Sequence, residues 1–96
     1  MTIQYEIPDQ SWIIEKFGDF QFNIHMEECA ELIQAINKYI RLRDIESRGH
    51  VIEEMVDVLI CIEQLRIMLD ITDTELQSEI DWKYERTQRR LGIDEK

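Results

Sequence analysis

The stretch that decides the fold covers residues 51–69 and reads VIEEMVDVLICIEQLRIML. It is apolar over most of a helical circumference, which predicts a helix at the centre of the molecule. Its polar window holds Glu53, Glu54, Asp57 and Gln64. Carboxylates on an otherwise buried helix need partners, because an unpaired charge is costly to desolvate. Glu54 and Asp57 border the apolar flank most closely, so we expect them to point inward.

Capping residues and glycines predict where three further helices begin and end. A short helix, capped by Asp9 or Ser11, should end near Phe17, because Gly18 follows. A long helix should cover residues 19–42, and the polar turn RDIESRGH, with Gly49 as its breaker, should separate it from the central helix. The capping box Thr72-x-x-Glu75 opens a last helix, expected to reach residue 91. The pattern predicts one all-α domain over residues 1–96, folded as a four-helix bundle.

A second acidic cluster, Glu27-Glu28-x-x-Glu31, lies on the long helix. Carboxylates three or four residues apart project from the same side of a helix. Glu28 borders the expected apolar stripe, Glu31 lies next to it, and Glu27 is furthest round. The stripe consists of Phe22, Cys29, Leu32, Ile33, Ile36 and Ile40. Paired with the central helix, the cluster would form a cage of four carboxylates that suits hard divalent cations, made of Glu28, Glu31, Glu54 and Asp57.

These clusters resemble the signature of the MazG-type all-α nucleoside triphosphate pyrophosphohydrolases, EExxE followed after a variable gap by ExxD. The resemblance covers residues 17–90. It implies cleavage of a (deoxy)nucleoside triphosphate between its α and β phosphates, giving a monophosphate and pyrophosphate, with removal of non-standard nucleotides as a role that this reaction could serve. It further implies that the four caged carboxylates bind Mg²⁺, with Mn²⁺ as a substitute. Glu27 or Glu53 would then be an outer ligand or a partner of the attacking water.

A triphosphate also needs cations. Lys83, Arg86 and Arg90 stand on one face of the last helix and resemble the basic segment that follows the acidic motifs in the family. That segment often includes an asparagine, whereas Thr87 stands here. The alternative is a set of solvated basic residues near a helix C-terminus. In that case the phosphate-binding cations would be Lys38 and Arg41, or would come from a second subunit.

Aromatic residues upstream of the first acidic cluster could stack on a nucleobase. Trp12 and Phe17 are the preferred candidates, ahead of Phe20 and Phe22. Gln21 and Asn23 are the candidate polar readers of the base. The alternative is that the aromatic side chains belong to the core.

Composition narrows the range of partners. The chain has 96 residues, a net charge of −10 and a pI near 4.5, which argues against affinity for nucleic acid or anionic membranes. The N-terminal sequence lacks the features of a signal peptide, so we expect a cytoplasmic protein. Cys29 and Cys61 are expected to be buried, reduced thiols. The apolar central helix of so short a chain predicts a homodimer or homotetramer.

Two other functional classes remain open. His25 and His50 each precede a glutamate by three residues, which brings a di-iron or di-manganese bundle into consideration, although that class usually shows the order Glu-x-x-His. A non-catalytic helical interaction module would explain apolar helices with acidic faces. Iron content would identify the first class, and failure to hydrolyse any nucleotide would favour the second.

Overall fold

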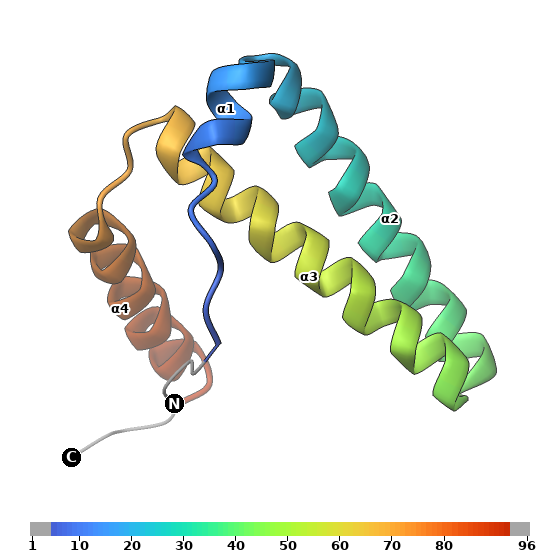
Figure 1. Cartoon of the computed structure of the whole chain (residues 1–96). Coiled ribbons are helices and arrows are strands. Elements are labelled where there is room, and N and C mark those ends of the chain that lie inside the picture. The colour runs from blue at the N-terminus through green and yellow to red at the C-terminus, as the bar shows by residue number, and fades with distance from the viewer. Residues whose placement is uncertain (1–4, 93–96) are drawn as a thin grey trace.

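The computed structural model describes residues 5–92, which form four α-helices and no strand (Figure 1). They are α1 (Ser11–Phe17), α2 (Phe20–Leu42), α3 (Ile45–Met68) and α4 (Asp73–Arg90). The predicted all-α class is confirmed. α2 and α3 pack together as an antiparallel hairpin, and α1 packs against both near their open end. α4 packs against none of the other three helices in this part of the chain, which differs from the expected four-helix bundle.

The prediction for the start of the third helix was wrong. α3 begins at Ile45, so Gly49 lies inside the helix and does not break it. Asp44 accepts a hydrogen bond from the Ser47 N–H (2.8 Å), and the Asp44 N–H donates to the Ser47 hydroxyl (3.4 Å). This capping box satisfies free N–H groups of the first turn. Arg43, in the left-handed region with φ +52°, ends α2 and reverses the chain.

Side-chain hydrogen bonds mark the starts of the two shorter helices, α4 and α1. The predicted capping box of α4 is confirmed, because the Glu75 N–H donates to Thr72 Oγ1 (3.1 Å) and Glu75 Oε1 accepts from the Thr72 N–H (3.3 Å). α1 is preceded by Gln10 and not by Asp9 or Ser11 as its N-cap. Asp9 instead accepts hydrogen bonds from the hydroxyl and the N–H of Ser11, which lower the pKa of Asp9.

The faces that α2 and α3 turn toward each other are largely polar. α2 buries Gln21, His25 and Ala35, and α3 buries Ser47, Glu54, Cys61 and Gln64. The stripe that we expected to face inward on α2 instead points largely to solvent, and Ile33 is 68% exposed. Met55, Val56 and Ile62 of α3 are also exposed. The hairpin therefore joins its polar faces and leaves apolar faces outside.

The two cysteines have different environments, so the prediction that both are buried was wrong for one of them. Cys29 is exposed and Cys61 is buried, and both are free thiols. Burial, with a smaller contribution from nearby Glu28, raises the pKa of Cys61 to about 11. The Cys61 thiol therefore stays protonated at neutral pH and serves as a small packing group.

A chain of amides ties the N-terminal segment to the hairpin. Gln10 donates to the carbonyl of Pro8 (2.7 Å) and accepts from Gln64 Nε2 (3.0 Å). Gln64 Oε1 accepts from Gln21 Nε2 (3.0 Å) and lies 2.8 Å from His25 Nε2. Buried amides are costly without partners, so this network fixes how residues 8–10, α2 and α3 fit together.

No helix within residues 5–92 is both long and apolar enough to cross a membrane.

Candidate metal centre

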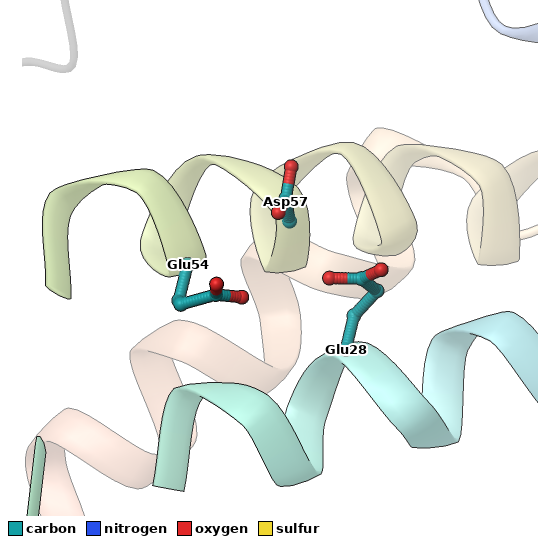
Figure 2. Close-up of side chains that lie close together, drawn as sticks. All are labelled: Glu28, Glu54 and Asp57. Carbon is teal, nitrogen blue, oxygen red and sulfur yellow. The ribbon is translucent and has the colours of Figure 1, made fainter. Parts of the chain in front are cut away.

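Three of the four predicted ligands converge between α2 and α3. Glu28 projects from α2, and Glu54 and Asp57 project from α3, one turn apart (Figure 2). One carboxylate oxygen from each residue lies within 4.8 Å of the others. Each acidic cluster thus contributes at least one carboxylate to this group of three.

Two carboxylate oxygens of this cluster are buried without a hydrogen-bond partner. Glu54 is buried, with 8% of its surface exposed, and its Oε2 atom has no hydrogen-bond partner. The Oε2 atom of Glu28 is likewise buried without a partner. Oxygens in this state cost free energy unless a cation or a proton joins them. An all-carboxylate donor set with unpartnered oxygens fits a hard divalent cation such as Mg²⁺.

The carboxylates also change one another's acidity. Burial, followed by the charges of Glu31, Asp57 and Glu54, raises the pKa of Glu28 to about 7. Burial and the charges of Glu31 and Asp57 raise the pKa of Glu54 as well, against a smaller opposite effect from His50. Without a cation, the cluster therefore retains protons at pH values where an isolated glutamate would be ionised.

The other predicted acidic residues lie outside this group of three. Glu31 is exposed but close enough to raise the pKa of both Glu28 and Glu54, so it borders the cluster. Glu27 and Glu53, the candidate partners of the attacking water, are exposed and each immediately precedes a residue of the cluster. Their position at the rim keeps them in contact with solvent.

A cleft of about 620 Å³ opens beside the cluster, between α2 and α3. Glu31 and Glu54 line one part of it, and Lys38, Arg41 and His50 also line it. His50 Nε2 lies 3.4 Å from Glu54 Oε1. A larger cleft, of about 810 Å³, lies between the N-terminal segment, the end of α3 and the start of α4, and none of the cluster's carboxylates lines it.

The predicted phosphate-binding cations are on α4 and therefore not beside the cluster within this chain. Lys83 and Arg90 are exposed, and the Arg86 guanidinium stacks on the Trp82 ring at 4.8 Å. The Thr87 hydroxyl donates a hydrogen bond to the Lys83 carbonyl (2.9 Å).

The predicted base-recognition residues differ in their exposure to solvent. Trp12 and Phe17 on α1 are exposed, at 62% and 48%, and remain available for stacking. Gln21, in contrast, is buried with its amide donated to Gln64. Asn23 is exposed on α2. Gln64 was predicted to lie in a polar window, but its hydrogen bonds were not predicted. The available signal was an amide on a largely apolar helix, because a buried amide needs hydrogen-bond partners.

His50 is the residue beside the cluster whose place the sequence did not indicate. Its spacing of four residues from Glu54 was the available signal, because such residues are neighbours on a helix. His25 is held in the amide network, and no histidine belongs to the group of three carboxylates in the described residues.

No protein-family model, curated protein or solved structure matches this chain.

Proposed function

We propose that this chain is a Mg²⁺-dependent nucleoside triphosphate pyrophosphohydrolase acting on the cytoplasmic nucleotide pool. The observation that carries the proposal is the convergence of Glu28, Glu54 and Asp57. One oxygen from each lies within 4.8 Å of the others, and Glu28 and Glu54 each have a buried Oε2 atom without a partner. The resemblance of EExxE and ExxD to the MazG-type signature supplies the substrate class. The adjoining cleft has a volume typical of small-ligand sites.

The roles of the residues follow from their positions. Glu28, Glu54 and Asp57 would hold Mg²⁺, with Glu31 at the edge of the site. The bound metal would lower the pKa of a water and neutralise charge that develops on phosphate. Glu27 and Glu53, at the rim, are the groups that can accept the proton of the attacking water. The water oxygen bonds to the α-phosphorus, the bond from that phosphorus to the α–β bridging oxygen breaks, and its electron pair leaves with pyrophosphate.

The proposal includes assembly into a homodimer or homotetramer. The accessible surface of the chain is 8046 Å², whereas a compact monomer of 11.6 kDa exposes about 5,800 Å². Only Ala35 and Cys61 are buried among the apolar residues of the described part. Two copies that covered this excess would bury on the order of 4,000 Å², as obligate homodimers do. The exposed stripe of α2, including Ile33, Ile36 and Ile40, is a suitable surface.

Sedimentation at micromolar concentration tests the assembly. We expect a dimer or tetramer in the parent and dissociation or unfolding when Ile33→Glu places a charge in the apolar stripe. Lys16→Glu, on the exposed surface of α1, is the control and should keep the parental mass. A stable parental monomer would contradict the assembly.

A panel of canonical and modified nucleoside triphosphates with Mg²⁺ tests the reaction. The expected products are monophosphate and pyrophosphate in equal amounts, and their formation should disappear in Glu54→Gln. Glu15→Gln removes an exposed carboxylate from α1 and should leave the rate unchanged. Release of single phosphate, or no hydrolysis of any triphosphate by the oligomeric protein with Mg²⁺ or Mn²⁺, would contradict the proposal.

The second candidate is a non-catalytic helical interaction module. The observation in its favour is the extent of exposed apolar surface on α2, α3 and α4, including Ile33, Met55 and Ile80. Under this alternative, the Glu54→Gln variant would bind its protein partner like the parent, and the carboxylate cluster would have no effect on any reaction.

A further inference from the structure

The cleft beside the carboxylate cluster is bipolar. Glu31 and the buried Glu54 line it, and so do Lys38 and Arg41 from the last two turns of α2. Lys38 lies seven residues after Glu31, almost two helical turns, and therefore on nearly the same face of α2. The rise of the helix places it about 10 Å further along the axis. Negative and positive groups thus occupy successive positions along one wall.

The basic groups of the cleft are not committed to other side chains. Lys38 and Arg41 are exposed, and within residues 5–92 neither forms an ion pair with a carboxylate. Nor does either side chain take part in a hydrogen bond of the described structure. Gln34 and Asn37 add amide groups to the same wall. Arg43, only two residues after Arg41, is by contrast held by the Ile40 carbonyl and the Tyr39 ring.

A cleft of this kind discriminates among ligands. A free cation would gain from Glu54, whose Oε2 atom lacks a partner, but would be repelled at Lys38 and Arg41. A free phosphate would gain from the basic groups and be repelled by the carboxylates. A divalent cation complexed with a polyphosphate carries both kinds of charge and matches both parts of the cleft.

We propose that Lys38 and Arg41 bind the terminal two phosphates of a metal-complexed triphosphate, with the chain of phosphates extending from the carboxylates toward the α2–α3 turn. This inference rests on the proposed function and sets the direction of the substrate. The pyrophosphate that leaves would remain on the basic part of the cleft, while the nucleoside would extend toward the opposite end. Lys38 and Arg41 would stabilise the negative charge that the leaving pyrophosphate gains as the bond from its oxygen to the α-phosphorus breaks.

Inorganic pyrophosphate with Mg²⁺ is a suitable probe, because it contains no base or sugar and is the proposed leaving group. Calorimetric titration should show binding to the parent, and Lys38→Ala and Arg41→Ala should each weaken it on the order of tenfold or more. Mg²⁺ alone should bind to both variants at least as tightly as to the parent, because each substitution removes a charge that repels a free cation. Lys38→Arg should restore most of the affinity, which a merely structural role in the turn would not require.

Two controls locate the effect. Arg48→Ala removes the same charge from an exposed position of α3 that does not line the cleft, and it should leave pyrophosphate affinity within about twofold, since exposed charges contribute little. Lys83→Ala and Arg86→Ala test the alternative set of cations on α4. If these two weaken pyrophosphate binding while the Lys38 and Arg41 variants bind like the parent, the inference is overturned.

The experiment separates this inference from the proposed function. A protein that cleaves triphosphates but binds pyrophosphate independently of Lys38 and Arg41 overturns the inference alone. A protein that binds Mg²⁺–pyrophosphate through these two residues, yet cleaves no triphosphate, supports the binding site and contradicts the proposed function. A parent that does not bind Mg²⁺–pyrophosphate overturns the inference.

Discussion

The α2–α3 hairpin and α4 differ in whether their polar side chains are buried. The hairpin encloses carboxylates and amides, with Glu54 and Gln64 buried between its helices. α4 buries none of its residues and leaves its basic side chains in solvent or on its own Trp82. Polar groups between two helices weaken a hydrophobic interface. The hairpin interior therefore holds polar groups that need partners, whereas most of the apolar surface of α2 and α3 lies outside it.

The largest expected effect comes from removing a carboxylate of the hairpin. Glu54→Ala or Asp57→Ala should reduce turnover by more than about 100-fold, since even outer partners of metal ligands are worth 10- to 100-fold. The helical content of both variants should stay near that of the parent, because loss of a charge relieves repulsion within the cluster. Steady-state kinetics and circular dichroism measure the two effects. Turnover within a few fold of the parent in both variants would exclude these residues as ligands.

A smaller effect is expected when the amide network is interrupted. Gln64→Leu removes the partner of Gln10, Gln21 and His25, so the free energy of unfolding should fall by roughly 1–3 kcal/mol. On α4, Gln77 donates only to exposed Asp81, and Gln77→Leu should change stability by less than about 0.5 kcal/mol. Urea unfolding of the two variants compares the regions directly. Equal effects would mean that the buried network adds nothing beyond a surface contact.

The raised pKa of Glu28 predicts a dependence of stability on pH in metal-free protein. The pKa of this group is about 7 in the folded chain, above its usual 4.5. The folded state therefore holds a proton that the unfolded state releases, and stability present below pH 4.5 is lost as pH rises through about 7. Glu28 is partly exposed, and solvent screens the repulsion, so the change should be moderate.

Thermal melts in chelator between pH 4.5 and 7.5 measure this loss. Glu28→Gln should flatten the profile, whereas Glu85→Gln, on exposed α4, should reproduce the parental slope. Mg²⁺ should restore stability at pH 7.5 in the parent and in Glu85→Gln, but not in Glu28→Gln. A parental melting temperature that rises steadily over this range would contradict the raised pKa of Glu28.

The smallest effect concerns Gly49, within α3. A Cβ atom at this position would meet no atom within 4 Å, and alanine is favoured over glycine in a helix interior by about 1 kcal/mol. Gly49→Ala should therefore stabilise the protein by up to about 1 kcal/mol in urea unfolding. Gly18→Ala is the contrasting variant, because its φ of +56° disfavours a side chain. Destabilisation by Gly49→Ala would mean that the hairpin requires flexibility there.

The positions of the helices were predictable from the sequence, but which of their faces are buried was less predictable. Capping residues and glycines located α1, α2 and α4 to within a few residues, whereas Gly49 was wrongly read as a breaker because the box formed by Asp44 and Ser47 was overlooked. Periodicity correctly identified an apolar stripe on α2. It could not show whether Ile33 and its neighbours meet α3 or lie outside, since hydrophobicity is the same signal in both cases.

The candidate site was predictable in part for a related reason. Helical spacing alone brings Glu54 and Asp57 together, and the need to neutralise buried charge indicates Glu28 as their partner. Gln21 was assigned to base recognition because its partner, Gln64, lies 43 residues further along the chain and no local pattern connects them. The separation of Lys83 and Arg86 from the cluster depends on the turn between α3 and α4. The spacing of basic residues within α4 carries no information about the geometry of that turn.

The amide network determines where a single proton sits. Because the Pro8 carbonyl takes the Gln10 amide N–H, the Gln10 oxygen must face Gln64, whose own oxygen must then face His25. An oxygen can only accept, so His25 must carry hydrogen on Nε2, and this tautomer is set by a proline outside every helix. Nitrogen chemical shifts should report a protonated Nε2 in the parent and a mixture of tautomers in Gln64→Leu. The position of the N-terminal segment thereby sets the tautomer of His25, which lies three residues before Glu28.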